Sequence, residues 1–486
     1  MRKRISCLLM CLLFLCCALF TASAESPAGT EITSGSYIYV IQDDGTAKIT
    51  QYTGQDVAVT IPDTLDGIPV TAIGASAFQS NIAITDVVIP EGIVSLGDSA
   101  FKRCTSLEYV TLPDSLTDVG VNPFAGCEAL LDITVDKAGN PNLRMVNGVL
   151  YSLNDCRLIY YSRKNEPGEY KVKQGTRIIG AEAFYECENI TRLKIPKKSD
   201  EAGAVALTAI GRRAFYGCEN LKSINLEDTE ISTIGSDAFF GCVKLKKLAF
   251  PNKVTSIAER AFYGCENLTE LILPEAITSI GEMAFRNCSS LVSIKLPDGV
   301  TSIGKNTFAG CKDLEELILP DGLRYIGGGA FLGCRSLVKL ELPESVDYIG
   351  TEAFSDCTAL EEIKIPDGCS YIGASAFYKC MSLKSLVLPA DLYTINPSTF
   401  SGCSGLEEIE LPEDLEEIGE RAFFCCTSLT EIVIPDPVES IGDYAFSLCV
   451  KLEKIELPED LETIGPNTFD EAQLSFLPDL SDMIEE

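Results

Sequence analysis

The sequence predicts an α/β-type solenoid that is mostly β, with about sixteen coils of 23 residues and a parallel sheet on one face. A phenylalanine recurs every 23 residues from Phe239 to Phe469. The same unit starts at less regular spacing at five earlier positions: Phe78, Phe101, Phe124, Phe184 and Phe215. A fixed period of this length is typical of repeat proteins whose coils stack on one another.

The apolar positions within one unit predict the shape of the coil. The L-x-x-L-x-L run at 268–273 predicts a short strand, and the proline that follows ends it because it has no N–H to continue a ladder. Residues 277–280 (I-T-S-I) predict a second inward edge. The A-F-x-x-C spacing at 284–288 predicts one short helical turn. A single coil of this size should not fold alone, so stacking on its neighbours is obligatory.

A glycine follows the second edge in most coils, as in Gly281, Gly304, Gly327 and Gly350. Asn396 replaces it in one coil, which favours a left-handed backbone, since Asn tolerates positive φ best after Gly. Ala258 in another coil favours a requirement for small size alone. We expect positive φ at most of these positions.

The repeat pattern L-x-x-I-x-I/L-P-x-x-V/L-x-x-I-G-x-x-A-F-x-G-C resembles the leucine-rich repeat superfamily, and more closely its BspA-like branch. The resemblance covers roughly residues 57 to 472. It implies a leucine-rich repeat solenoid and a secreted or surface protein, and it leaves the ligand open because the family spans many unrelated surface proteins.

The domain organisation follows from the phase of the repeats and from composition. We expect a signal peptide at 1–24, an N-terminal β-hairpin cap at 25–55, leucine-rich repeats at 56–133, a hairpin insertion at 134–175, leucine-rich repeats at 176–472 and an acidic tail at 473–486. Asp44-Gly45 and Asn154-Asp155 mark the turns of the two hairpins. We interpret the insertion as bulging from the solenoid. The alternative is a separate functional module.

The first 24 residues have a basic start, an apolar run and a small-residue cleavage site, as secretory signal peptides do. The predicted location is therefore secreted or extracellular, with association at a cell surface, and no membrane insertion of the mature chain. The chain carries a formal net charge of −32, which argues against nucleic acid and anionic membranes as partners.

Twenty-one cysteines would suggest disulfides in a secreted chain, but their spacing indicates otherwise. Four lie in the signal peptide, and fourteen occupy one repeat position, from Cys104 to Cys449. A column of equivalent inward positions is typical of small buried hydrophobic residues, so we predict unpaired thiols.

Catalysis finds little support in the residues present. The chain has no histidine, which removes His-based triads, general bases and metal ligands. We therefore expect no enzyme, no cofactor and no metal ion. Glu407, Glu408 and Glu410 keep a carboxylate glycosidase as a remote alternative.

Outward positions of the first strand are the candidate binding surface, because packing fixes the inward ones. At the residue before the I/L-P pair, apolar residues interrupt charged ones along the array: Ile272, Lys295, Ile318, Glu341, Lys364, Val387, Glu410 and Val433. Neighbouring residues change from basic near 192–247 to acidic near 407–456. An ordinary solvated sheet remains the alternative interpretation.

A second candidate is a stripe of Tyr325, Tyr348 and Tyr371, which stacking should place about 5 Å apart. Aligned aromatics can grip a peptide or glycan, or can form a ladder that stacks only on itself.

The leading hypothesis is an adhesin-like binding protein that engages host matrix, host-cell or neighbouring-cell proteins, or a glycan, through the outward sheet face. The second hypothesis is a structural surface or matrix component that associates with itself. The sequence leaves the oligomeric state open.

Overall fold

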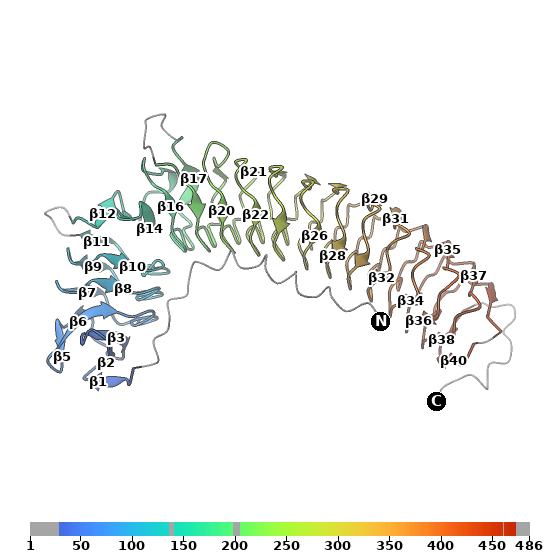
Figure 1. Ribbon diagram of the computed structural model, residues 1–486, viewed down its shortest axis with the longest axis horizontal. Coiled ribbons are helices and arrows are strands. Elements are labelled where there is room, and N and C mark those ends of the chain that lie inside the picture. The colour runs from blue at the N-terminus through green and yellow to red at the C-terminus, as the bar shows by residue number, and fades with distance from the viewer. Residues whose placement is uncertain (1–28, 136–139, 198–204, 460, 473–486) are drawn as a thin grey trace, which may run out of the picture.

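The computed structural model describes residues 29–135, 140–197, 205–459 and 461–472, which form a mostly β solenoid of about 18 turns. Figure 1 shows these turns stacked in an elongated, curved array. Every element in the described ranges is a strand, so the predicted fold class is confirmed as mostly β. The predicted signal peptide and the acidic tail lie outside the described residues.

Each coil begins with a short strand whose middle residue points into the core, because successive side chains of a strand alternate. Parallel pairing aligns equivalent positions of neighbouring coils, so Leu248 lies beside Leu271. We call these strands the first row. They are β4 (Ala58–Thr60), β7 (Asp86–Val88), β9 (Tyr109–Leu112), β11 (Asp132–Val135), β15 (Gly168–Lys171), β17 (Ile190–Lys194), β19 (Ser223–Ile224), β21 (Lys247–Ala249), β23 (Glu270–Ile272), β25 (Ser293–Lys295), β27 (Glu316–Ile318), β29 (Lys339–Glu341), β31 (Glu362–Lys364), β33 (Ser385–Val387), β35 (Glu408–Glu410), β37 (Glu431–Val433) and β39 (Lys454–Glu456).

The predicted second edge is a second parallel strand in each coil. Its isoleucine points inward, as Ile303 and Ile326 do when they pair in register. These strands are the second row: β6 (Ile68–Ile73), β8 (Ser95–Leu96), β10 (Asp118–Val119), β16 (Ile178–Ile179), β18 (Ala209–Ile210), β20 (Thr233–Ile234), β22 (Ser256–Ile257), β24 (Ser279–Ile280), β26 (Ser302–Ile303), β28 (Tyr325–Ile326), β30 (Tyr348–Ile349), β32 (Tyr371–Ile372), β34 (Thr394–Ile395), β36 (Glu417–Ile418), β38 (Ser440–Ile441) and β40 (Thr463–Ile464). The short β5 (Thr64–Leu65) pairs antiparallel with β6.

The segment expected to form a helical turn folds differently. Residues 282–287 make consecutive tight turns, and the backbone turns left-handed twice, at Met283 (φ 56°) and Asn287 (φ 60°). The same pair of positions has positive φ in coil after coil, for example at Glu352 and Asp356. Two left-handed residues four apart cannot continue a right-handed helix, so the coil closes through turns.

The prediction of positive φ at the glycine after the second strand is wrong. Gly281, Gly304, Gly327 and Gly350 are not among the residues with positive φ. The glycine instead allows close backbone contact between coils, because a Cβ on Gly281 would lie 2.5 Å from the backbone nitrogen of Glu259. Small size is therefore the requirement, as the alanine at 258 indicated. Asn396 is accommodated by donating from Nδ2 to the carbonyl oxygen of Ile372 at 2.7 Å.

The core is a stack of phenylalanines with a column of thiols beside it. From Phe239 to Phe469, rings of neighbouring coils stack with centroids 5.1 to 5.7 Å apart. All described cysteines are free, and the fourteen column cysteines are buried. Each thiol also has a bonding partner, since the Cys288 thiol lies 3.2 Å from the Phe262 carbonyl oxygen of the preceding coil. The same contact recurs at the other column positions.

An antiparallel meander covers the first coil, as the cap prediction requires. It consists of β1 (Ile32–Ser34), β2 (Tyr37–Ile41) and β3 (Ala47–Tyr52), with the β2–β3 turn at the expected Asp44-Gly45. β3 then pairs parallel with β6, so the meander leads directly into the second row.

The insertion is a second meander of the same topology. It consists of β12 (Leu143–Val146), β13 (Val149–Ser152) and β14 (Arg157–Tyr161), and β14 pairs parallel with β16. The hairpin at Asn154-Asp155 is thus confirmed, but it does not bulge from the solenoid. β13 is buried along its whole length and separates two hydrophobic clusters, one on each side of the meander.

Polar contacts connect the two sides of this internal meander. Glu182 is 2% exposed, and its carboxylate lies 2.6 Å from Nζ of Lys102, a residue of the N-terminal coils. Asn122 donates from Nδ2 to the carbonyl oxygen of Glu182 at 2.7 Å. A buried charge needs such partners, so the two parts of the solenoid are joined at a defined position.

Candidate binding surface on the first row of strands

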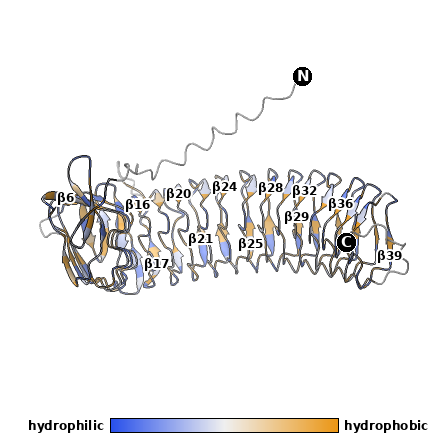
Figure 2. Cartoon of the chain, turned by 90° about the horizontal axis from the view of Figure 1, so that it is seen from below, coloured by the Kyte–Doolittle hydropathy of each residue, from blue (hydrophilic) through white to orange (hydrophobic). Residues whose placement is uncertain are grey.

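The eight predicted strand residues, from Ile272 to Val433, all lie on the outward side of the first row. Leu271 is 6% exposed, whereas Ile272, the next residue in β23, is 56% exposed. Ile318, Val387 and Val433 occupy the same position on other strands and are 46%, 65% and 56% exposed. The charged members of the set are exposed as well: Lys295, Glu341, Lys364 and Glu410. Parallel pairing of neighbouring strands therefore brings these residues into one row, in the predicted register. Figure 2 shows the first-row strands side by side along the array.

Local ion pairs hold several of the charged side chains on this surface. Lys295 lies 3.2 Å from Glu275, and Lys364 lies 2.8 Å from Glu344, a residue in the turn before β30. The hydrogen bond that Lys364 donates to the carboxylate of Glu344 raises the pKa of Lys364 above its ordinary value. Exposed pairs of this kind contribute little to stability, but they fix where the charges lie. The exposed aliphatic side chains are left as the accessible apolar contacts between them.

The tyrosine stripe lies on the second row and not on the candidate surface. Tyr325, Tyr348 and Tyr371 stack with ring centroids 4.8 and 4.7 Å apart, close to the predicted spacing. Because the rings cover one another's faces, only the two end faces, the ring edges and the hydroxyl groups are accessible. The self-stacking alternative therefore describes their geometry, and the two rows run separately along the array (Figure 2).

Sequence reasoning missed a second aromatic ladder. Tyr185, Tyr216, Phe240 and Tyr263 stack with centroids 5.3, 4.7 and 4.7 Å apart. The signal was the aromatic residue after the repeat phenylalanine in AFYEC, AFYGC and AFFGC. Tyr185 is buried and the other three rings are half-buried. Nζ of Lys102 lies 4.9 Å from the centroid of the Tyr185 ring. The ladder therefore belongs to the structural junction next to the internal meander.

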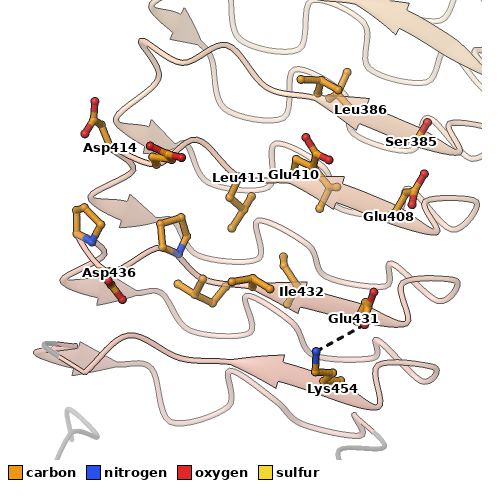
Figure 3. A pocket seen from close by; sticks show the side chains of 17 residues that line it. Ser385, Leu386, Glu408, Glu410, Leu411, Asp414, Glu431, Ile432, Asp436 and Lys454 are labelled. Carbon is orange, nitrogen blue, oxygen red and sulfur yellow. Dashed lines mark ion pairs between the residues drawn. The ribbon is translucent and has the colours of Figure 1, made fainter.

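Two grooves are hollowed into the first-row surface. One, which we call the basic groove, runs over β15 to β23 and is lined by seven basic and three acidic side chains. The other, the acidic groove, runs over β33 to β39 and is lined by six acidic side chains and one lysine. Figure 3 shows Glu408, Glu410, Asp414 and Asp436 around the acidic groove, with Lys454 paired to Glu431 at its edge. The change from basic to acidic residues in the sequence is thus a separation of charge on one face.

Two of the three carboxylates named for the glycosidase alternative lie on β35. Glu408 and Glu410 are both exposed on this open strand. Among residues 29–135, 140–197, 205–459 and 461–472, no group of three or more Cys, Asp or Glu side chains could hold a metal ion. In the same ranges, no helix is long and apolar enough to cross a membrane.

Comparison with known proteins agrees with this architecture. A model of the BspA-type leucine-rich repeat region matches residues 59–144, 177–301, 278–396 and 370–483. The chain belongs to the BspA-type leucine-rich repeat family. Proteins of this kind are generally binding or structural proteins. No curated protein matches the sequence.

Several solved structures of bacterial leucine-rich repeat proteins are similar to this chain. A leucine-rich repeat protein from Bacteroides ovatus is 28% identical, with a TM-score of 0.51, over 90% of this chain and 92% of that one. A leucine-rich cell surface protein from Faecalibacterium prausnitzii is 26% identical, with a TM-score of 0.41, over 88% and 95%. A leucine-rich repeat protein from Eubacterium ventriosum is 21% identical, with a TM-score of 0.44, over 72% and 95%. The first of these supports the fold over nearly the whole chain.

Proposed function

We propose that this chain is a secreted or cell-surface-associated, adhesin-like protein that binds host or neighbouring-cell proteins through the outward face of its first row. The observation that carries the proposal is the row of exposed aliphatic residues Ile272, Ile318, Val387 and Val433. These side chains lie outside the core, and the exposed part of each leaves apolar surface in contact with water. Apolar residues placed every two or three coils among charged ones are suited to a protein partner that buries them.

The energetic case rests on burial in a complex. A fully buried Val or Ile side chain contributes about 1.5–3 kcal/mol relative to an exposed one. A few such residues dominate most protein interfaces, and the surrounding charges provide specificity and speed of association. Lys295, Glu341, Lys364 and Glu410 are the surrounding charges here, since they lie between the aliphatic residues of the row.

Export supports the extracellular part of the proposal. The basic start, the apolar run and the Ala22-Ser23-Ala24 site in the first 24 residues have the order that secretory signal peptides show. Family membership is consistent with a surface repeat protein.

The test is to replace Ile272, Ile318 and Val387 together by Ser and to measure binding to a panel of immobilised host matrix proteins. We expect weaker binding with almost unchanged stability, because exposed substitutions usually change stability by less than about 0.5 kcal/mol each. Leu271→Ala is the matched control. It lies one residue away but inward, and should cost about 2–5 kcal/mol of stability.

Two outcomes would contradict the proposal. Large destabilisation by the triple serine variant would mean that these side chains contribute to the core. Unchanged binding by a stable triple variant would move the binding site elsewhere, with Tyr325, Tyr348 and Tyr371 as the next residues to replace.

A further inference from the structure

The basic groove is unusual on a chain with a formal net charge of −32, because its lining side chains sum to +4. Several of these positive charges are not neutralised locally. Within the described part of the chain, Lys194 and Lys247 pair with Glu169 and Glu270, whereas Lys222 and Lys246 form no ion pair. The groove therefore presents uncompensated positive charge on an exposed face.

The acidic groove is its counterpart further along the same face. Its lining side chains sum to −5, and Glu431 with Lys454 forms an ion pair there, at 3.9 Å. Glu408 and Glu410 form no ion pair with any described residue. Both grooves also have exposed aliphatic residues, Ile272 in the basic one and Val387 with Val433 in the acidic one.

The two grooves are matched in position as well as in charge. The basic groove reaches its last strand at β23 and the acidic groove starts at β33, so the midpoint between them lies between β27 and β29. Strand β21 of the basic groove and strand β35 of the acidic groove lie at equal distances from this midpoint. They are seven coil steps apart, or about 34 Å at the usual spacing of about 4.8 Å between strands. A second molecule turned by 180° about the strand direction would place β21 opposite β35 twice.

We propose that the basic groove of one molecule binds the acidic groove of a second copy of this chain, and that a two-fold arrangement forms both contacts at once. In this arrangement Lys247 faces Glu408 of the second copy, and Ile272 faces its Val387. The contact is isologous, because the same face serves both molecules, and it closes as a dimer. A strongly acidic chain repels its copies elsewhere, so charge complementarity selects this orientation.

The expected dimer is weak and sensitive to salt. Each exposed ion pair changes an association constant only a few-fold, and ions screen charges beyond a Debye length of about 8 Å at physiological ionic strength. We therefore expect dimerisation of the purified mature chain in sedimentation velocity at low salt. Raising the salt to about 0.5 M should weaken the association at least ten-fold, because the Debye length then falls below about 5 Å.

Charge reversal tests the pairing of the grooves directly. Lys246→Glu with Lys247→Glu changes the summed charge of the basic groove from +4 to 0 and places two carboxylates opposite the acidic groove. Glu408→Lys with Glu410→Lys changes the summed charge of the acidic groove from −5 to −1 and places two ammonium groups opposite the basic groove. We expect each double variant to be monomeric alone, and a mixture of the two to form heterodimers. Lys305→Glu with Lys312→Glu, which reverses two exposed charges outside both grooves, is the matched control and should dimerise like the unmodified chain.

The proposal fails if the unmodified chain is monomeric at all salt concentrations, or if a dimer forms that neither double variant weakens. It also fails if the mixed variants do not associate. Assembly beyond a dimer would overturn the two-fold arrangement. Binding of heparin by a monomeric chain, lost in the Lys246→Glu, Lys247→Glu variant, would show that the basic groove takes an acidic polymer in place of a second copy.

Discussion

At the scale of single residues, the glycine after the second strand shows what a repeat sequence leaves undetermined. The substitutions Asn396 and Ala258 pointed to opposite causes, and the sequence could not decide between them. The decision depends on how closely neighbouring coils approach, which is a property of the stacked array. The left-handed backbone occurs instead at positions such as Met283 and Asn287. Different residue types occupy these positions in different coils, so the sequence does not indicate the positive φ there.

Replacement of Gly281 by Ala is expected to destabilise the protein by about 1–3 kcal/mol, the usual cost of overpacking. Its new Cβ would lie 2.5 Å from the backbone nitrogen of Glu259, and backbone cannot move aside cheaply. Gly304→Ala is the matched control, since its Cβ would meet its nearest neighbours, atoms of Glu282, at 3.4 Å. Urea unfolding of both variants measures the difference. Equal stability of the two would contradict the role assigned to close coil contact.

The column cysteines were predicted to be unpaired from their spacing alone, and the structure agrees. Denatured protein without reductant should therefore react with a thiol reagent at all column cysteines. The folded protein should react at few of them, because burial protects the thiols and raises their pKa. Mass spectrometry after alkylation counts both sets. Fewer than about ten reactive column thiols after unfolding would show that the column is bridged, against the usual behaviour of buried free cysteines.

The same burial makes stability depend on alkaline pH. It raises the pKa of the Cys265 and Cys311 thiols from 9.0 to about 12. Between these values the unfolded chain has lost protons that the folded chain keeps, so stability is complete below pH 9 and falls as pH rises toward about 12. Each such thiol contributes a slope of about 1.4 kcal/mol per pH unit. Urea unfolding at several pH values should show a shallower slope for Cys265→Ala with Cys311→Ala, and an unchanged slope would contradict this account.

At the scale of elements, the sequence predicted the coils and hairpins better than the packing that connects them. The 23-residue period, the proline after the first strand and the Asn154-Asp155 turn identified the coils and the hairpin correctly. The burial of the internal meander on both faces was missed, because its alternation fits a surface hairpin equally well. Glu182 carried no signal either, since its partner Lys102 is eighty residues away in the sequence.

Because the internal meander separates two hydrophobic clusters, we expect the coils on its two sides to be destabilised separately. Leu150 belongs to the hydrophobic cluster on the N-terminal side and Leu158 to the cluster on the other side, and both are fully buried. We expect Leu150→Ala to lower mainly the stability of the N-terminal coils and Leu158→Ala that of the later ones, each by about 2–5 kcal/mol. Hydrogen exchange resolved along the chain distinguishes the two effects. Identical exchange patterns in both variants would mean that the solenoid unfolds as one unit across the meander.

At the scale of the whole molecule, the charge gradient was visible in the sequence, but the grooves were not. Outward residues such as Ile272 and Glu410 could be assigned from the strand alternation. The sequence could not show that this gradient ends in two grooves on one face, because the grooves form only when the coils stack in three dimensions. The proposed ligand surface and the proposed dimer contact consequently share Ile272 and Val387.

Self-association and ligand binding should therefore compete. At low salt, the fraction of chains captured by an immobilised matrix protein is expected to fall as the chain concentration rises, because dimers cover the aliphatic row. The monomeric variant Lys246→Glu with Lys247→Glu should be captured in a constant fraction over the same concentrations, while its intact Ile272, Ile318 and Val387 keep the binding itself. Surface plasmon resonance at low and high salt measures both chains. If the unmodified chain dimerises and is still captured in a constant fraction, the two contacts use different faces, and the ligand surface must lie outside the grooves.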